Sequence, residues 1–295
     1  MADLPVRGAT VRELELPLPP GRMPSWRAGR PLKRWRYVGV FAPDVMLCVG
    51  DARIGPLRQR WWAVGLPDGS LRERTTLRAG GIRLEPPVDV AAAPPAGEGI
   101  RPARARVRGR GIAIDLELDE AAGVEVVSPV GRRGAHIWTR KQALVPVRGT
   151  VEVDGRRHEI DGDHGFVDDS AGYHDRHTAW RWSAGVGTLD DGRRVGWNLV
   201  DGVHDSPQAS ERAVWLGGEP VEVGPVRFAD DLSSVAFADG SALAFAQRSE
   251  RTHSTNALLV RSRYRQPFGT FHGSLPGGLR LAEGFGVMED HDVHW

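Results

Sequence analysis

Cysteine, lysine and long apolar runs are all scarce in this sequence of 295 residues. The one cysteine, Cys48, excludes an intrachain disulfide, and its place in the apolar run VMLCVG predicts a buried, inert thiol. Lysine occurs only at Lys33 and Lys141, so arginine supplies nearly all of the positive charge, a bias that we attribute to genomic base composition. No charged-then-apolar signal segment opens the chain, and no stretch approaches the roughly 20 apolar residues of a membrane helix. We therefore expect a soluble, cytoplasmic protein without a membrane span.

A charge bias is lacking as well, because 39 Lys and Arg balance 38 Asp and Glu to give a net charge of +1. Such a chain has no global field that would attract nucleic acid. One strand face is basic, since Arg104, Arg106 and Arg108 recur at period two. The next segment carries Asp115 and Glu117 on one face, which is typical of a hairpin with cross-strand ion pairs, each worth roughly 0.2–1 kcal/mol. We expect this hairpin and no nucleic-acid partner.

A helical period is also missing, because no segment sustains apolar residues at i, i+3, i+4 and i+7. The 37 glycines and 21 prolines suit a chain with many tight turns. Short apolar runs recur at roughly 8–12-residue spacing. The turn signals between them include Gly55–Pro56, Asp68–Gly69, Asp154–Gly155, Asp191–Gly192 and Asp239–Gly240. This pattern predicts an all-β fold of antiparallel barrels or sandwiches with little helix.

The domain organisation follows from composition. Residues 1–34 are rich in proline, glycine and arginine, which predicts an extended N-terminal arm draped over the first domain. Residues 35–145 and 146–295 are expected to form two similar β domains, although no internal repeat is evident. Residues 85–102 form a proline-alanine stretch that is too long and too polar in its backbone for a buried loop.

The segment 161–182, DGDHGFVDDSAGYHDRHTAWRW, concentrates acidic, histidine and aromatic side chains. Its first part, through residue 176, has no helical or strand period and contains three glycines, which predicts a loop. From residue 177 to residue 187 the sequence alternates like a strand, with Trp180 and Trp182 on one face and Arg181 on the other. Loops that carry chemistry are commonly mounted on rigid sheets, so we expect the ligand-binding region here.

The tryptophans of the second half allow two interpretations. Trp180 with Trp182, and Trp197 with Leu199, would each fill one face of a hairpin. They form either a packed aromatic core or the lining of an apolar pocket in the mouth of a β-barrel. With nearby polar side chains they make up the candidate ligand-binding set: His164, Tyr173, Trp180, Arg181, Trp182, Trp197, Asn198 and His291.

Several familiar catalytic motifs are absent. Asp168-Asp169-Ser170 resembles a nucleophile elbow only faintly, because it lacks the first glycine and leads into no helix. His174 and His177, with His164 and the nearby aspartates, could supply metal ligands, yet the chain offers the two histidines no matched second pair. No glycine-rich phosphate fingerprint occurs. We therefore expect neither a metal nor a cofactor.

The C-terminal strand supplies a candidate acid. Phe285, Val287, Glu289 and His291 alternate onto one face, so a carboxylate follows two apolar side chains into the same environment. Either the strand leaves the core after Val287, or Glu289 lies at the rim of a pocket, where desolvation would raise its pKa and suit it to general-acid catalysis. The candidate catalytic acids are accordingly Asp168, Asp169 and Glu289.

Four separated blocks occur in an order that resembles the domain-of-unknown-function family 2804. They are WTRKQALVPVRGTV (138–151), DDSAGYHDRHTAWRWSAGVG (168–187) with GWNLVDG (196–202), QPFGTFHG (266–273) and EGFGVMEDHDVHW (283–295). The resemblance extends from about Trp35 to the C-terminus.

More remotely, an acidic loop followed by a Trp-x-Trp strand resembles the double lipocalin-like proteins, which include carotenoid hydratases of the hydroxyneurosporene synthase type and tocopherol cyclase. This resemblance implies two lipocalin-like barrels with an apolar ligand between or within them. It also implies acids that protonate an alkene, at positions matching Asp168 or Asp169 and His164. The chain departs from that pattern at Gly165-Phe166, where a second aromatic residue usually follows the Asp-His pair.

Three functions stay open on the sequence. The first is binding of an apolar, lipid- or terpenoid-like small molecule in a tryptophan-lined barrel pocket. The second is a cofactor-independent hydratase, cyclase or isomerase that uses a carboxylic acid, which requires that acid to lie within the pocket with a raised pKa. The third is a scaffold or interaction protein, which an exposed apolar patch without an internal cavity would favour. The sequence leaves the oligomeric state open.

Overall fold

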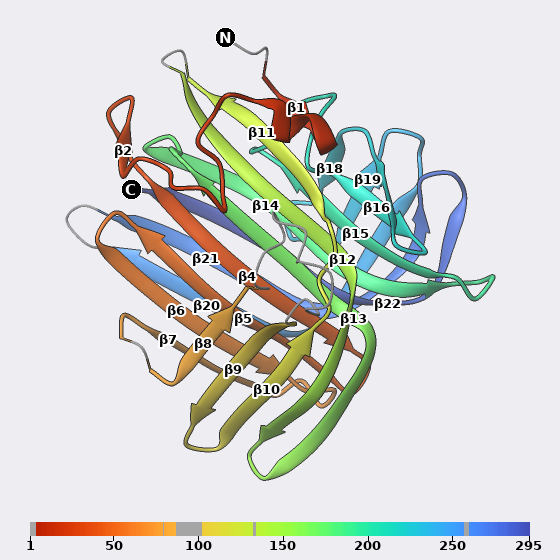
Figure 1. The fold of residues 1–295 in the computed structure, drawn as a ribbon. Helices are drawn as coiled ribbons and strands as arrows, with labels where there is room; N and C mark the ends of the chain where they lie inside the picture. Colours follow the sequence, from red (N-terminus) through yellow and green to blue (C-terminus); the bar gives the residue numbers. More distant parts are fainter. Residues whose placement is uncertain (1–3, 79, 87–101, 132–133, 257–259) are drawn as a thin grey trace, which may run out of the picture.

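The computed structural model describes residues 4–78, 80–86, 102–131, 134–256 and 260–295, and its regular structure is almost entirely β (Figure 1). The strands form two large antiparallel sheets and a small ribbon of β2 (Trp26–Arg27) with β3 (Arg30–Pro31). In these ranges the one helix is a 3-10 turn, η1 (Gly8–Glu13). The all-β prediction is therefore confirmed. No helix in the described part of the chain is long and apolar enough to cross a membrane, and the cytoplasmic location stays a prediction.

The first sheet contains the strands up to Gly172. In spatial order they are β7 (Leu71–Thr76), β6 (Leu57–Gly65), β5 (Val45–Ile54), β4 (Lys33–Ala42), β13 (Arg156–Gly172), β12 (Ala135–Val153), β10 (Ile112–Leu118), β9 (Ala103–Gly109) and β8 (Ile82–Glu85). β13 runs along nearly the whole of β12, whose other edge pairs first with β11 (Val124–Val130) and then with β10. β1 (Val6–Arg7) extends β11. The sheet curls until β8 contacts β5 and β6, which gives it a barrel-like interior.

The second sheet contains the remaining strands. In spatial order they are β17 (Glu219–Glu222), β16 (Ala213–Leu216), β15 (Arg194–Asp201), β14 (His177–Leu189), β22 (Leu279–His294), β21 (Arg261–Leu275), β20 (Ala242–Asn256), β19 (Ser234–Phe237) and β18 (Val226–Phe228). This sheet also curls, because β18 contacts β15. The chain passes from the first sheet to the second at residues 173–176, whereas the expected domain boundary at 145/146 falls within β12.

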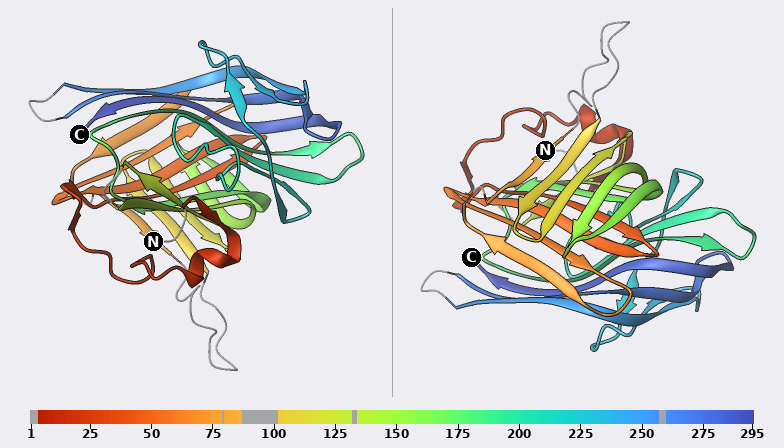
Figure 2. Two further views of the ribbon diagram at one scale, coloured as in Figure 1. Left: turned by 90° about the horizontal axis from the view of Figure 1, so that it is seen from above. Right: turned by 90° about the horizontal axis from the view of Figure 1, so that it is seen from below.

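The two curled sheets stack on one another, so that each has an inner face and a face toward its neighbour (Figure 2). Val38 and Val40 of β4 point into the first sheet's interior, while the alternating Tyr37 and Phe41 point toward the second sheet. We call the layer between them the inter-sheet layer. Its buried apolar members come from both sheets and include Phe41, Met46, Phe166, Trp182, Val186, Phe268, Phe285 and Val287.

The loop predicted for residues 161–176 is wrong, because β13 continues through this segment to Gly172. Its glycines do not end the strand; they allow it to bend against β12. A Cβ atom on Gly165 would lie 2.7 Å from the Val145 carbonyl oxygen, and Gly162 has a φ of +137°, which favours glycine. The pairing register shifts beside them, between Ala143 and Val147. Only residues 173–176 remain irregular.

Other local predictions fare better. The N-terminal arm is largely irregular, and its Val11 and Met23 pack against Trp138 of the first sheet. The predicted arginine-acid hairpin is β9–β10, in which Arg106 pairs with Asp115 at 3.0 Å. Cys48 is fully buried, and burial raises the pKa of its thiol to about 12. The proline-alanine loop of 85–102 lies almost entirely outside the described residues.

Gly185 is closely packed against the interior of the second sheet, and this packing can be tested by substitution. A Cβ atom at this position would lie 2.1 Å from Cζ2 of Trp197. We expect Gly185→Ala to lower the free energy of unfolding by roughly 1–3 kcal/mol, because the indole must move out of a packed core. Gly224→Ala is the matched control, since nothing lies within 4 Å of its Cβ position. Urea unfolding of both variants measures the difference, and equal midpoints would contradict it.

Candidate active site between the two sheets

Glu289 lies in the inter-sheet layer, on the same face of β22 as Phe285 and Val287. The alternation predicted for this strand is therefore correct, and the strand does not leave the core after Val287. Glu289 pairs across the strands with Trp182 of β14. Its carboxylate is buried under half-buried aromatic side chains and has no ion-pair partner among the described residues.

Three hydrogen bonds hold the Glu289 carboxylate. Trp180 Nε1 donates to Oε1 at 2.8 Å, while Tyr264 OH and Gln266 Nε2 each donate to Oε2 at 2.9 Å. Burial raises the pKa of Glu289 to about 7, and the donors from Trp180 and Tyr264 oppose that rise only in part. The result is a carboxyl group that can both give and take a proton near neutral pH.

A second polar group faces Glu289 from the first sheet. Asp168 of β13 lies 2.5 Å from Nζ of Lys141 on β12, and Glu211, from the segment before β16, lies 3.4 Å from the same Nζ. Burial raises the pKa of Asp168, with Lys141 opposing the rise. The charge of Asp168 in turn raises the pKa of Glu289, so the two carboxyl groups interact electrostatically across the layer.

Two buried histidines border this group. The rings of His174 and His204 lie 6.4 Å apart at nearly a right angle, and His174 packs on Trp35. Burial lowers the pKa of both, that of His204 to about 3, so they are neutral at ordinary pH. In the described ranges none of their four ring nitrogens has a hydrogen-bond partner. Buried polar atoms are normally satisfied, so these are available to a bound polar group.

The aromatic and amide side chains predicted from β14, β15 and β22 surround the acid. His291 packs edge-on against Trp180 at 4.4 Å, and its Nε2 lies 2.9 Å from Ser262 Oγ. Trp182 Nε1 donates to Asn198 Oδ1 at 2.8 Å, and Asn198 Nδ2 donates to the Glu211 carbonyl oxygen. Through Asn198, Trp182 is connected to Glu211, whose carboxylate lies beside Lys141 in the Asp168 group.

Other predicted site residues do not contact the Glu289 group, because they point to the other face of their strand or lie farther along the chain. Asp169 points into the first sheet's interior, where Arg36 and Arg140 lower its pKa, so it does not meet the requirement for a general acid. Arg181 pairs with Asp230 at 2.9 Å on the far face of β14. Trp197 donates to Ser183 Oγ inside the second sheet.

Tyr173 and His164 are also separated from Glu289. Tyr173 OH donates to the Pro24 carbonyl oxygen at 2.8 Å and so fastens the N-terminal arm. His164 lies four residues before Asp168 along β13, which is about 13 Å in an extended strand. Burial, followed by the charge of Arg194, lowers the pKa of His164.

Sequence reasoning missed Lys141, Glu211, His204, Tyr264 and Gln266. They lie on three separate segments of the chain, namely β12, residues 202–212 and β21. Lys141 and Gln266 fall within the blocks that resemble the family, but none of the five belongs to a motif with a recognisable spacing. Besides those blocks, the scarcity of lysine in the sequence was a usable signal for Lys141. Both lysines are buried, at 1% for Lys33 and 3% for Lys141, which is unusual for this residue type.

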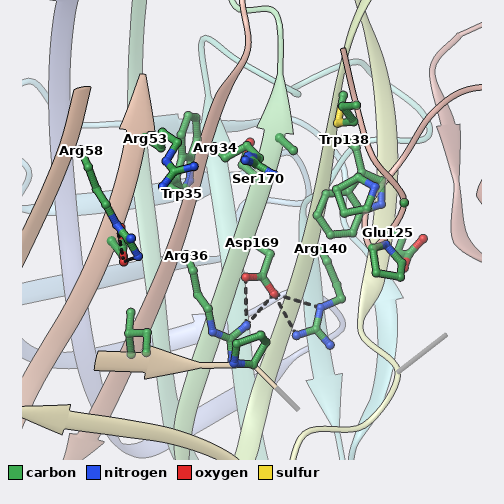
Figure 3. A pocket seen from close by; sticks show the side chains of 18 of the residues that line it. Arg34, Trp35, Arg36, Arg53, Arg58, Glu125, Trp138, Arg140, Asp169 and Ser170 are labelled. Carbon is green, nitrogen blue, oxygen red and sulfur yellow. Dashed lines mark hydrogen bonds and ion pairs between the residues drawn. The ribbon is translucent and has the colours of Figure 1, made fainter. Parts of the chain in front are cut away.

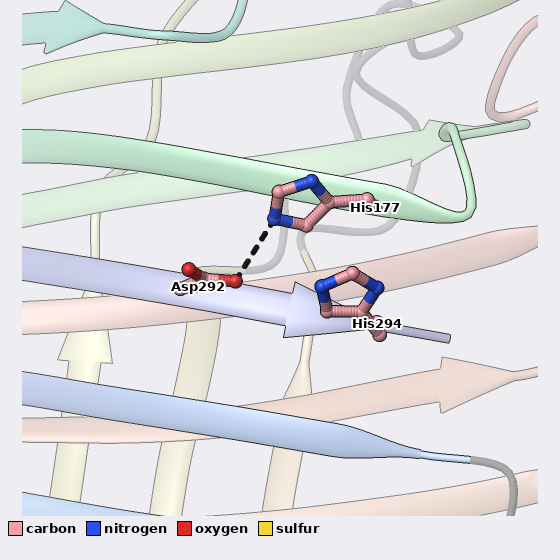
Figure 4. Close-up of side chains that lie close together, drawn as sticks. All are labelled: His177, Asp292 and His294. Carbon is pink, nitrogen blue, oxygen red and sulfur yellow. Dashed lines mark hydrogen bonds and ion pairs between the residues drawn. The ribbon is translucent and has the colours of Figure 1, made fainter.

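His177, Asp292 and His294 form the group of side chains that could hold a metal ion in the described part of the chain (Figure 4). His177 Nε2 lies 3.0 Å from Asp292 Oδ1, and the two imidazoles stack at 4.0 Å. The donor atoms lie within 4.8 Å of one another, but parallel rings direct their nitrogen lone pairs side by side, so the rings would have to rotate to share an ion. His164 and His174, the other histidines considered as ligands, do not belong to this group.

Solved structures share this architecture. A protein from Nitrosomonas europaea, provisionally described as AttH, superposes with a TM-score of 0.53 at 12% identity, over 94% of this chain and 98% of that chain. Kievitone hydratase from Nectria haematococca superposes with a TM-score of 0.51 at 11% identity, over 88% of each chain. Identities this low establish a common fold alone. No curated protein matches the sequence.

Most of the sequence also matches a protein-family model. The model named Domain of unknown function (DUF2804) matches residues 59–295, which include all four blocks noted in the sequence and the strands that carry Glu289 and Asp168. This chain therefore belongs to the DUF2804 family.

Proposed function

We propose that this chain is a cofactor-independent acid–base enzyme that acts on an apolar small molecule bound between the two sheets, with Glu289 as its general acid. The observation that carries the proposal is the buried Glu289 carboxyl group, held by Trp180, Tyr264 and Gln266 and with its pKa raised to about 7. Perturbed acids of this kind cluster at functional sites. Of the three candidate acids, Glu289 and Asp168 are the two whose pKa is raised by burial.

The hydrogen bonds suggest which oxygen carries the proton. Oε2 accepts from both Tyr264 and Gln266, whereas Oε1 accepts from Trp180 alone and keeps more acceptor capacity free. Protonated Glu289 would therefore deliver its proton from Oε1. The same three donors then stabilise the carboxylate that is left, which lowers the barrier to proton transfer.

The surroundings suit an alkene or polyene substrate. Proton transfer to an alkene carbon leaves a carbocation, and the faces of Trp180, Trp182 and Tyr37 are negative surfaces that stabilise a cation. Capture of the cation by water, followed by loss of a proton to the Glu289 carboxylate, gives hydration. Capture by an internal double bond, followed by the same proton loss, gives cyclisation, and loss of a neighbouring proton alone gives isomerisation. Asp168, with Lys141, supplies a polar wall on the other sheet where a water molecule or a substrate hydroxyl could be oriented.

The structural neighbours add a fold-level analogy. One of them is a hydratase by its description, and hydration is among the three outcomes above. Because one fold can host unrelated reactions, the analogy supports the reaction class without identifying the substrate.

The leading alternative is a ligand-binding protein without catalysis. The aromatic side chains around Trp180 and the apolar inter-sheet layer would serve it equally well. The two proposals differ in one respect: a binding protein has no need of a proton-transfer group that is destabilised by burial. A saturable ligand that quenches tryptophan fluorescence but never exchanges protons would favour this alternative.

Proton exchange in D₂O provides a direct test of the enzyme proposal. Incubation with a panel of isoprenoid and polyene alkenes should place deuterium on carbon in at least one compound, as detected by mass spectrometry. Glu289→Gln should slow this exchange by roughly 10²–10⁴-fold, the usual contribution of a general acid. The matched control is Glu283→Gln, an exposed carboxylate on the same strand. Exchange at the wild-type rate in Glu289→Gln would contradict the proposal.

The raised pKa of Glu289 also predicts the pH dependence of stability. The folded protein holds this proton up to about pH 7, whereas the unfolded chain releases it near 4.5, so the wild type loses stability as pH rises through this window. Relative to Glu289→Gln, the wild type should lose up to about 3 kcal/mol between pH 4.5 and 7, with no further loss above it. Urea unfolding at a series of pH values measures this difference. A constant difference across the window would show that Glu289 titrates normally.

A further inference from the structure

A second candidate site lies on the other side of the first sheet. A cavity of about 490 Å³ opens there, on the face of β13 that carries Asp169 rather than Asp168 (Figure 3). Pro19, Pro20 and Met23 of the N-terminal arm form part of its lining. Its volume falls within the range of small-molecule pockets, roughly 300–1,000 Å³. Strand alternation separates this cavity from the Glu289 site by the thickness of one sheet.

The floor of the cavity is charged but internally balanced. Asp169 accepts hydrogen bonds from Arg36 at 2.8 and 2.9 Å and from Arg140 at 2.9 and 3.1 Å (Figure 3). The buried Glu120 pairs with both guanidinium groups as well. Two carboxylates therefore neutralise two arginines, and this group is a rigid base for the cavity with no charge left over.

The rim carries an excess of positive charge. Arg34 of β4 and Arg53 of β5 line the cavity and are direct cross-strand partners. Like charges in this position repel one another. Neither guanidinium has a hydrogen-bond or ion-pair partner among the described residues, whereas the lining carboxylate Asp51 is already engaged by Arg58 and Arg60. An anion bound between Arg34 and Arg53 would remove the repulsion and could accept two charge-assisted hydrogen bonds.

The remaining lining includes the Arg12–Glu125 ion pair, the hydroxyl group of Ser170 and an apolar wall. Four apolar side chains line this wall: Met23 of the arm, Leu84 of β8, Pro86 directly after β8, and Trp138 of β12. A simple inorganic anion would leave this wall without a partner. We propose that the cavity binds an amphipathic organic anion, with its acidic group between Arg34 and Arg53 and its apolar body against Trp138 and Met23. This site is independent of Glu289 and of the reaction proposed there.

Isothermal titration calorimetry of the full chain tests this site with three probes: decanoate, the neutral 1-decanol and inorganic sulfate. We expect one decanoate per chain, with decanol and sulfate each binding at least tenfold more weakly. The double variant Arg34→Gln/Arg53→Gln should weaken decanoate binding at least tenfold, because both charge-assisted hydrogen bonds are lost.

Two controls locate the effect. Arg227→Gln/Arg280→Gln removes the same charge from exposed positions on the second sheet and should leave decanoate affinity within twofold of the wild type. Glu289→Gln should also leave it unchanged, which keeps this test separate from that of the proposed enzyme. Absence of saturable decanoate binding, or equal affinity in the two double variants, would overturn the proposal. Sulfate binding as tight as decanoate would overturn the amphipathic assignment.

Discussion

The structure depends on one constraint: two curled sheets meet along a layer that is mostly apolar but contains ionisable side chains. Burying a carboxyl group is costly unless hydrogen bonds or an opposite charge compensate. Glu289 is compensated by three neutral donors, which leaves its protonated form accessible. Asp168 is compensated by the ammonium of Lys141. The layer thus contains two carboxyl groups in different environments. Such a difference allows one carboxyl group to act as an acid while the other acts as a base.

Strand alternation distributes chemistry between separate compartments. Asp168 and Asp169 are neighbours in sequence, yet one faces the inter-sheet layer and the other faces the arginines inside the first sheet. Trp182 and Arg181 on β14 diverge in the same way. A single sheet therefore separates the proposed acid–base site from an arginine-lined cavity, because successive side chains of an extended strand point to opposite faces.

Local patterns were predictable where the period of the strand and the hydrophobic pattern agree. The alternation of Phe285, Val287 and Glu289 is as expected, and so is the arginine-acid hairpin of β9 and β10. The segment 161–176 was misjudged, because glycines that permit a bend and a close approach, such as Gly165, look the same in sequence as glycines that end a strand. The spacing of Trp180 and Trp182 could not decide whether they fill a core or line a pocket, since both environments require apolar side chains on one face of the strand.

The sequence by itself determined the all-β class, the hairpin positions and the face of β22 on which Glu289 lies, because these follow from a period of two and from turn chemistry. Only the tertiary structure decided which side chains meet. Tyr264 and Gln266 reach Glu289 from the neighbouring strand β21, and Glu211 reaches Lys141 from the other sheet. These contacts join residues 23 to 70 positions apart in the chain and leave no periodic trace in it, because they depend on which strands pair and on how the sheets are stacked.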